Sequence, residues 1–261
     1  MKNLEHITKP IREEMARFEA YFEQSLKADT EPMDSIMKYV QASQGKRLRP
    51  ILVLLSTKLL GEVNERTLRA ATFVEMVHSA TLIHDDVVDN AEQRRNKPSV
   101  KAQFGNLSAV LAGDYLLAKA MLLIANDTDI LNEMLSTTAA MSEGELMQNI
   151  VADCVSQSEK TQYLDIITRK TAMLMRSCCV AGALSVDATP EQVQQIANFG
   201  LNFGILFQLR DDMLDGENTT EAQALLPKYL EKTMESLERF PASETLEALR
   251  DLTVFCAERE E

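Results

Sequence analysis

Two short acidic segments have residue types and a spacing that suit the binding of divalent cations. They share the pattern DDxxD and consist of Asp85, Asp86 and Asp89 in "HDDVVD" and of Asp211, Asp212 and Asp215 in "RDDMLD". On a helix, residues four apart lie on one face with Cβ atoms about 5–6 Å apart, so the first and last carboxylates of each segment point the same way. Each segment follows a mostly apolar stretch. We therefore expect the two segments to face one shared cavity.

Six clustered carboxylates repel one another and raise their own pKa values unless a counter-charge is present. Hard divalent cations prefer such oxygen ligands, and Mg²⁺ keeps part of its water shell and recruits phosphate oxygens. We predict Mg²⁺ as the cofactor in a site for Mg²⁺ and diphosphate, with the ligands Asp85, Asp89, Asp211, Asp212 and Asp215. A single DDxxD is also found as an ordinary solvated helix end, and it is the second copy that favours metal binding.

Basic residues lie close to both predicted helix ends. The segment "GKRLR" begins at Gly45, and "RR" at Arg94 and Arg95 follows the first acidic segment. Guanidinium and ammonium groups form strong charge-assisted hydrogen bonds with phosphate oxygens. Taken alone, each short basic run is equally typical of a solvated turn.

The elements that must position these residues are predicted to be helices. Glycine and proline number 9 and 7 among 261 residues, tryptophan is absent, and good helix formers dominate. Apolar residues recur at three and four positions and hardly ever at two. The expected helices cover 1–29, 33–44, 51–61, 65–90, 109–125, 131–150, 159–185 and 190–215, with two more in 221–260. A basic loop closed by Pro50 and a loop over 92–100 separate some of them. One all-α, single-domain bundle around a central cavity, 1–261, is the prediction.

Charge and cysteine content limit the classes of function. A net charge of −13 and a pI near 4.8 argue against a broad nucleic-acid-binding surface. No apolar stretch is expected to reach the length of a membrane span, and the N-terminus is too charged for a signal peptide, so a cytoplasmic location is predicted. The four cysteines, at 154, 178, 179 and 256, lack metal-ligand spacing. They are expected to be reduced, and Cys178 and Cys179 to be small buried side chains.

Seven segments in order resemble the trans-isoprenyl diphosphate synthases, the polyprenyl synthetase family. They are "GKRLRP", "HSATLIHDDVVD", "RRNKPSV", "AVLAGDYLLAKA", "EGELMQN", "KTAMLMRSCCVAGA" and "FGILFQLRDDMLD". The resemblance runs from about residue 20 to residue 215 and resumes in the tail. It implies a Mg²⁺-dependent prenyltransferase that joins isopentenyl diphosphate to an allylic diphosphate.

The resemblance also implies roles for individual residues. The diphosphate of isopentenyl diphosphate is expected to contact Gly45, Lys46, Arg49, His78 and Arg95. Arg94 is expected on the allylic diphosphate, beside three Mg²⁺ ions held chiefly by Asp85, Asp89 and Asp211. The reaction centre is expected to be lined by Lys170, Thr171 and Gln208. From the residues alone, His78 is as well explained as a core histidine, and Thr171 and Gln208 as partners of nearby backbone.

The sequence departs from the family after Asp215. The family continues there with a segment that carries two lysines for the allylic diphosphate and the lid, whereas this chain moves directly to what resembles the final helices. Lys228 and Lys232 lie on an amphipathic helix, where surface charge is their simplest role. Two hypotheses remain open: an active short-form synthase, or a non-catalytic or regulatory subunit of a heteromeric synthase. A class I terpene cyclase is a third, although "GKRLRP" and "RRNKP" fit a second diphosphate.

Two further expectations concern assembly and product length. A homodimer is expected mainly from the resemblance, with the Ala-, Leu- and Met-rich helices 107–125 and 131–150 in need of cover. Thr81 and Ala80 precede Asp85 by four and five residues and are small, whereas in the family a bulky aromatic there stops growth at fifteen carbons. Val77 and Phe73 share the helix side of Ala80, with Phe73 about 10 Å deeper. Products of C20 to C25 are therefore predicted, unless Phe73 is simply a core residue.

Overall fold

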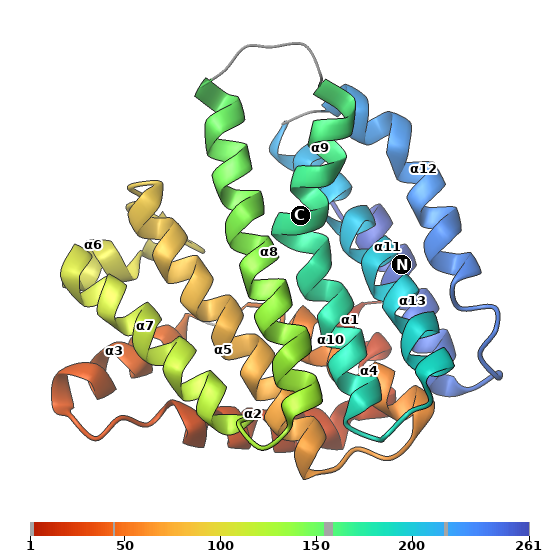
Figure 1. The fold of residues 1–261 in the computed structure, drawn as a ribbon, viewed down its shortest axis with the longest axis horizontal. Helices are drawn as coiled ribbons and strands as arrows, with labels where there is room; N and C mark the ends of the chain where they lie inside the picture. Colours follow the sequence, from red (N-terminus) through yellow and green to blue (C-terminus); the bar gives the residue numbers. More distant parts are fainter. Residues whose placement is uncertain (1–2, 44, 154–158, 217–218, 261) are drawn as a thin grey trace.

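The protein is a bundle of helices. The computed structural model describes residues 3–43, 45–153, 159–216 and 219–260 (Figure 1). The helices are α1 Leu4–Ile7, α2 Arg12–Leu26, α3 Glu31–Ala42, α4 Leu48–Leu60, α5 Glu65–Val88, α6 Val100–Phe104, α7 Asn106–Leu123, α8 Thr128–Asp153, α9 Glu159–Ile167, α10 Met173–Leu184, α11 Pro190–Asp215, α12 Thr219–Glu235 and α13 Glu244–Glu258. The predicted all-α fold is confirmed.

Helix α10 lies in the middle of the bundle and contacts α4, α5, α8 and α11 (Figure 1). Nearly all of its side chains are buried, including those of Cys178 and Cys179. The prediction that these two thiols are small core side chains is confirmed. Cys256 is also free and buried, and Cys154 lies outside the described residues. Helices α5 and α11 flank this core, and each carries one acidic segment at its C-terminal end.

The N-terminal segment differs from the single helix predicted over 1–29. Helix α1 ends at Ile7, a 3₁₀ turn covers Lys9–Ile11, and α2 begins only at Arg12. Pro10 explains the break, because it has no N–H to donate and its ring clashes with the preceding turn of an α-helix. The side chain of Asn3 caps α1 by accepting a hydrogen bond from the backbone N–H of His6.

The predicted loop that ends at Pro50 is also shorter than expected. Helix α4 begins at Leu48, so that Arg49 and Pro50 lie in its first turn. Proline is tolerated there because the first N–H groups of a helix have no intrahelical acceptor. Arg47, immediately before the helix, has the left-handed φ of 53°. This conformation is unusual for a residue with a side chain and is typical of a constrained site.

The loop over 92–100 contains a small antiparallel hairpin. Strand β1 is Gln93–Arg94 and strand β2 is Lys97–Pro98. The two residues between them, Arg95 and Asn96, have φ of 53° and 60°. Two consecutive positive φ values match a type I′ turn, the usual connection of a two-residue hairpin. The hairpin directs Arg95 toward the α3–α4 loop, where its Nη1 donates to the backbone oxygen of Ser43 at 2.9 Å.

The helix predicted over 159–185 contains a feature that the sequence does not reveal. Between α9 and α10 the chain forms one turn of π-helix over Thr168–Ala172. Two glycines in neighbouring helices make room for it: a Cβ on Gly144 would lie 2.7 Å from the backbone nitrogen of Lys170, and one on Gly204 would lie 2.5 Å from Cα of Ala172. Such π-turns often occur at functional sites. This one carries Lys170 and Thr171.

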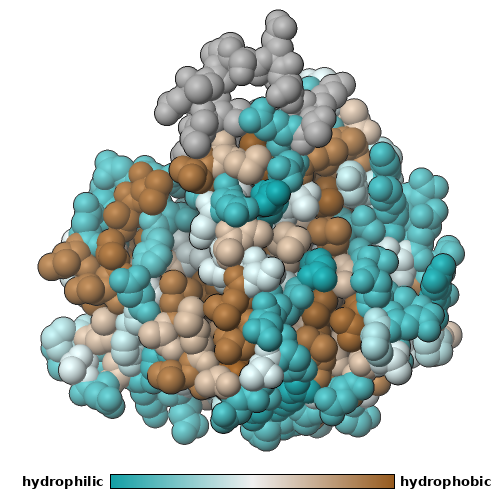
Figure 2. Space-filling model, viewed as in Figure 1, coloured by the Kyte–Doolittle hydropathy of each residue, from teal (hydrophilic) through white to brown (hydrophobic). Residues whose placement is uncertain are grey.

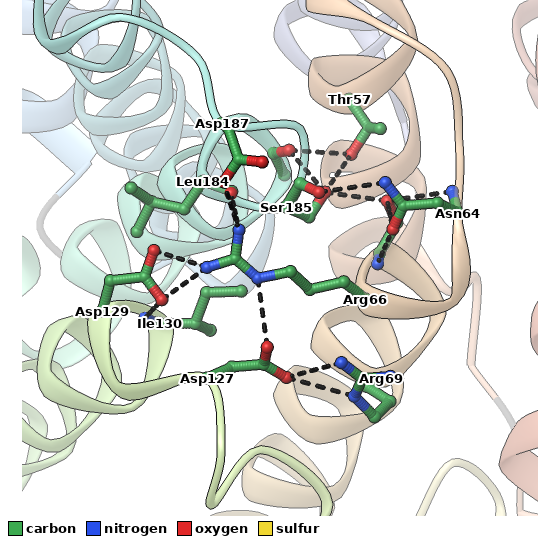
Figure 3. A network of polar contacts seen from close by, with 12 residues as sticks. Thr57, Asn64, Arg66, Arg69, Asp127, Asp129, Ile130, Leu184, Ser185 and Asp187 are labelled. Carbon is green, nitrogen blue, oxygen red and sulfur yellow. Dashed lines mark hydrogen bonds and ion pairs between the residues drawn. The ribbon is translucent and has the colours of Figure 1, made fainter.

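A polar network closes the end of the bundle that is remote from the acidic segments (Figure 3). Arg66, near the start of α5, forms ion pairs with Asp127 just before α8, with Asp129 in the first turn of α8 and with Asp187 before α11. Arg69 adds a second contact to Asp127 at 2.9 Å. These pairs join three connections of the bundle and fix the register of α5 against α8 and α11.

Helix α7 is apolar and poorly covered. It is long and apolar enough to span a membrane by length and composition, and only 28% of its residues are buried. The expectation that no stretch reaches such a length is therefore wrong for this helix, which nevertheless carries Asp114 and Lys119. Figure 2 shows apolar surface over the region of α6 and α7. The most exposed large apolar side chains of α7 are Leu107, Leu111 and Leu122.

Candidate active site

Five residues predicted to hold one diphosphate line a single cavity of about 450 Å³. They are Gly45, Lys46, Arg49, His78 and Arg95. The α3–α4 loop, the first turn of α4, the middle of α5 and the hairpin each contribute to it. A Cβ on residue 45 would lie 2.5 Å from Nη2 of Arg95, so a larger residue at this position would displace the guanidinium of Arg95.

Arg49 and His78 line both this cavity, which we call the basic cavity, and a second cavity next to it. Nη1 of Arg49 lies 2.9 Å from Nε2 of His78. Burial, followed by the charge of Arg49, holds the pKa of His78 well below its usual value, so the imidazole is neutral and its Nε2 accepts from the guanidinium. Nε of Arg49 is buried without a hydrogen-bond partner among the described residues. A buried guanidinium with an unsatisfied N–H is suited to an anionic ligand.

Arg47 lines the same cavity but has protein partners. Its guanidinium contacts Glu75 at 2.6 Å and Glu19 at 3.0 Å, and it lies 4.5 Å from the centre of the Phe22 ring. Arg47 is almost completely buried, and these contacts fix the strained loop before α4. Sequence analysis did not select Arg47 or Glu75. The basic run alone does not show which of its cations turns inward.

The second cavity, which we call the acidic cavity, has a volume of about 390 Å³ and shares Arg49 and His78 with the basic cavity. It contains the predicted Thr81, Asp85, Lys170 and Thr171, together with Glu145, which sequence analysis missed. Nζ of Lys170 lies 2.6 Å from the carboxylate of Glu145. The only signal for Glu145 was its place in the "EGELMQN" segment.

Asp85 is the crowded carboxylate of this cavity. Burial, and next the charge of Glu145, raise the pKa of Asp85 from 3.8 to about 6. A carboxylate among other negative charges is stabilised by a bound cation. Asp89, one turn further on, is the exposed C-cap of α5.

Asp86 and Arg94 form an ion pair beside this cavity. Oδ1 of Asp86 accepts from Nε and Nη2 of Arg94 at 2.9 and 2.6 Å, and the Asp86 side chain is buried. The structure thus gives Arg94, which was expected on the allylic diphosphate, a protein partner at the hairpin. Asp86 anchors the hairpin that presents Arg95.

The aspartates of the second acidic segment have different surroundings. Asp211 is paired with Arg259, whose guanidinium also lies 4.1 Å from the centre of the Phe207 ring. Burial raises the pKa of Asp211 from its usual value, and Arg259 opposes that shift. Arg259 also lines the basic cavity. Sequence analysis missed it, because nothing in its spacing relates the tail to the acidic segment. Asp215 is exposed at the end of α11.

Asp212 is buried and hydrogen-bonded within the protein. Its Oδ1 accepts from Nε2 of Gln208 at 2.7 Å, and its Oδ2 accepts from the hydroxyl of Tyr163. Oε1 of Gln208 in turn accepts from Oγ1 of Thr171 at 2.7 Å. The predicted residues Thr171 and Gln208 are thus in direct contact, and Tyr163 is an additional member of their network. Tyr163 left no sequence signal beyond an aromatic on a helix.

Comparison with known proteins identifies the family to which this chain belongs. The sequence pattern of the polyprenyl synthetase family matches residues 30–224. The chain belongs to the polyprenyl synthetase family of trans-prenyltransferases. The resemblance inferred from the motifs is confirmed.

Named relatives and a solved structure agree with this assignment. The chain is 32% identical over 224 residues to octaprenyl diphosphate synthase of Haemophilus influenzae, covering 85% of this chain and 68% of that enzyme. It is 33% identical over 205 residues to geranylgeranyl diphosphate synthase of Saccharolobus solfataricus, covering 72% and 59%. The polyprenyl synthase of Caulobacter crescentus, complexed with calcium and isoprenyl diphosphate, superposes with a TM-score of 0.91 at 25% identity over 99% of this chain and 98% of that one.

The donors present in this polyprenyl synthetase suit a divalent ion that also binds substrate. Asp85 and Asp211 are the half-buried acids, and both have raised pKa values. Among the described residues, no three His, Cys, Asp or Glu side chains gather closely enough to hold a metal ion by themselves. An ion at these carboxylates would complete its shell with water and diphosphate oxygens.

The residues predicted to set product length differ in their surroundings. Thr81 lines the acidic cavity. Ala80, Val77 and Phe73 are buried in the main core and do not line either of the two cavities. Whether a growing chain follows this side of α5 stays a prediction. Lys228 and Lys232 are exposed on α12, as predicted for surface charge.

Proposed function

We propose that this polyprenyl synthetase condenses isopentenyl diphosphate with an allylic diphosphate in a Mg²⁺-dependent reaction. The observation that carries the proposal is the pair of adjoining cavities, one basic and one containing Asp85, which share Arg49 and His78. Two diphosphates can therefore bind side by side, one in each cavity, with the half-buried Arg49 and His78 lining both sites.

The charges that line the two cavities support the assignment of one substrate to each cavity. Isopentenyl diphosphate keeps its diphosphate throughout, and cationic donors without a metal suffice to bind it. The basic cavity, with Lys46, Arg49 and Arg95, provides such donors. The allylic diphosphate must depart, so it belongs next to Asp85 and Lys170.

The reaction breaks the C–O bond of the allylic diphosphate, and the electron pair leaves with the diphosphate. The terminal alkene carbon of isopentenyl diphosphate attacks the allylic cation and forms the new C–C bond. This attack leaves the positive charge on the other alkene carbon. A proton is then lost from the carbon next to that cation to the released diphosphate, and a double bond is restored. Mg²⁺ held by Asp85, Asp89 and Asp211 would neutralise the charge that develops on the departing diphosphate.

The chain's own side chains protect and stabilise the cation. The oxygen of Thr171, whose hydroxyl donates to Gln208, provides a negative dipole at the acidic cavity, where a preorganised polar group is more effective than water. The apolar walls of α5 and α8, which include Leu82 and Met141, keep out water that would quench the cation.

The finer properties are also part of this proposal. Relatives range from geranylgeranyl to decaprenyl synthases, and we propose C20 to C25 products for this chain from the small residues Ala80 and Thr81 above Phe73. We propose a homodimer in which a second copy covers the apolar face of α7 that contains Leu107, Leu111 and Leu122. A cytoplasmic location stays a prediction.

The decisive experiment is incubation of the purified protein with both diphosphates and Mg²⁺, followed by chromatography of the products. We expect polyprenyl diphosphates, loss of activity in excess chelator, and a rate at least about 10³-fold lower for Asp85→Ala and for Asp211→Ala. The matched control is Asp165→Ala, a half-exposed acid on α9 whose one ion pair within the described part of the chain is with Arg169. Full activity in chelator would contradict the metal assignment. No product from the pure protein, but product after addition of a second synthase subunit, would favour the regulatory-subunit hypothesis.

A further inference from the structure

The hydrogen-bond chain from Tyr163 to Thr171 has one possible direction. A carboxylate only accepts hydrogen bonds, so Asp212 requires donors on both of its oxygens. The hydroxyl of Tyr163 is one donor and the Nε2 amide of Gln208 is the other. The orientation of the Gln208 amide follows, because its NH₂ group must face Asp212 and its oxygen must face away.

This orientation determines what Thr171 presents to the cavity. Oε1 of Gln208 cannot donate, so the hydroxyl of Thr171 donates to it at 2.7 Å. The hydrogen of Thr171 is thereby directed away from the cavity that Thr171 lines, and lone pairs remain on the cavity side. With the amide reversed, Thr171 would accept from nitrogen and its O–H would be free to point into the cavity.

The chain is held by the packing of three elements. Tyr163 lies on α9, Thr171 on the π-turn that follows it, and Gln208 with Asp212 on α11. Tyr163 is 9% exposed in an apolar cluster with Ile167, Leu206 and Leu209. Asp212 and Thr171 are also buried, at 6% and 9% exposure. Water therefore has little access with which to replace a missing partner.

We propose that Tyr163 and Asp212 are positioning residues that set the direction of this hydrogen-bond chain through Gln208, so that Thr171 presents oxygen, and not hydrogen, to a carbocation. The proposal rests on the proposed condensation reaction for its purpose, and on the observed contacts for its geometry. It gives Asp212 a different task from Asp85 and Asp211: its two oxygens orient an amide, and it is not a ligand of the metal.

Kinetics of four variants test the proposal. Tyr163→Phe removes one hydroxyl and should lower kcat about tenfold, in line with the loss of one hydrogen bond to a charged group. Asp212→Asn permits the amide to reverse and should lower kcat about a hundredfold. In both variants the Mg²⁺ concentration for half-maximal rate should stay within about twofold of wild type. Tyr229→Phe is the matched control, because Tyr229 has the same 9% exposure in the same apolar cluster, and its kcat should not change.

A double-mutant cycle separates positioning from simple loss of stability. Thr171→Val removes the hydroxyl at the end of the chain, so adding Tyr163→Phe to it should lower kcat no further. Fully multiplicative losses would overturn the proposal, because they would show that Tyr163 acts independently of Thr171. A tenfold or larger rise in the Mg²⁺ requirement of Asp212→Asn would also overturn it and would make Asp212 a metal ligand.

A spectroscopic measurement keeps this test independent of activity. In protein labelled with ¹⁵N-glutamine, the side-chain NH₂ signal of Gln208, assigned by its absence in Gln208→Ala, should shift in Asp212→Asn and in Tyr163→Phe. It should not shift in Tyr229→Phe. If wild type forms no product, the proposed function fails, and this signal alone still decides the hydrogen-bond chain. An unchanged Gln208 signal in Asp212→Asn would refute the assigned orientation.

Discussion

Replacing Asp85 by asparagine is expected to stabilise the protein while it abolishes activity. The pKa of Asp85 is raised from 3.8 to about 6, first by burial and then by Glu145. The folded protein therefore holds the Asp85 proton more tightly than the unfolded chain does. Ionisation of Asp85 then costs folding free energy, which is absent below about pH 3.8, grows between pH 3.8 and 6, and is constant above pH 6. Asparagine has nearly the same shape and carries no charge.

The size of the effect follows from the shift. A rise in the pKa of Asp85 from 3.8 to about 6 corresponds to at most roughly 3 kcal/mol of folding free energy. Asp85 is only half-buried and solvent screens part of its interaction with Glu145, so we expect about 1–1.5 kcal/mol. For a chain of this length such a gain raises Tm by roughly 3–5 °C.

Calorimetric unfolding in excess chelator, at pH 7.5 and again at pH 4.5, measures this difference. We expect Asp85→Asn to have the higher Tm at pH 7.5 and a smaller advantage at pH 4.5, where wild-type Asp85 is protonated in the folded protein. Addition of Mg²⁺ and inorganic diphosphate should raise the Tm of wild type more than that of the variant, because ligands stabilise the state that binds them. An equal or lower Tm for Asp85→Asn at pH 7.5 would refute the crowding of this carboxylate.

Three other predictions concern the product, the allylic site and the assembly. Ala80→Phe should shorten the product and Phe73→Ala should lengthen it, measured by chromatography of dephosphorylated products; an unchanged distribution in Ala80→Phe would place the tunnel elsewhere. The KM for the allylic substrate should exceed that for isopentenyl diphosphate, because the lysine-containing segment is missing and Arg94 is paired with Asp86; equally tight binding of a non-ionising allylic analogue by calorimetry would contradict this. Light scattering should give a dimer mass for wild type and a monomer mass for Leu111→Glu, and a wild-type monomer at micromolar concentration would refute the dimer.

The parts of the fold that were predicted correctly depend on local patterns. Helices α5, α7, α8 and α11 are long segments rich in helix-forming residues, and α11 also has a proline and a capping threonine at its start. The errors lie where tertiary packing decides. The start of α4 at Leu48 depends on Arg47, whose left-handed backbone is held by Glu19 and Glu75, far away in sequence.

The active site likewise contains features that the sequence predicted and features that depend on tertiary packing. The resemblance to the family implied that Lys46, Arg49, His78 and Arg95 share one diphosphate site, and the structure places all four on one cavity. Spacing does not state which oxygen of a DDxxD segment meets which partner. Asp86 and Asp212, the second aspartate of each segment, both turn into the protein, the first to Arg94 and the second to Gln208 and Tyr163.

The burial of both second aspartates has a common geometric cause. Adjacent residues on a helix point about 100° apart, so when the first aspartate of a DDxxD segment faces the cavity, the second must face a neighbouring element. A carboxylate that is buried against protein needs donors, or it would destabilise the fold. For Asp86 the donor is the hairpin arginine Arg94, and for Asp212 the donors are an amide and a phenol. The second aspartate therefore has a different use in each copy of the motif: Asp86 fixes the hairpin that presents Arg95, and Asp212 orients the side chain of Gln208 on its own helix.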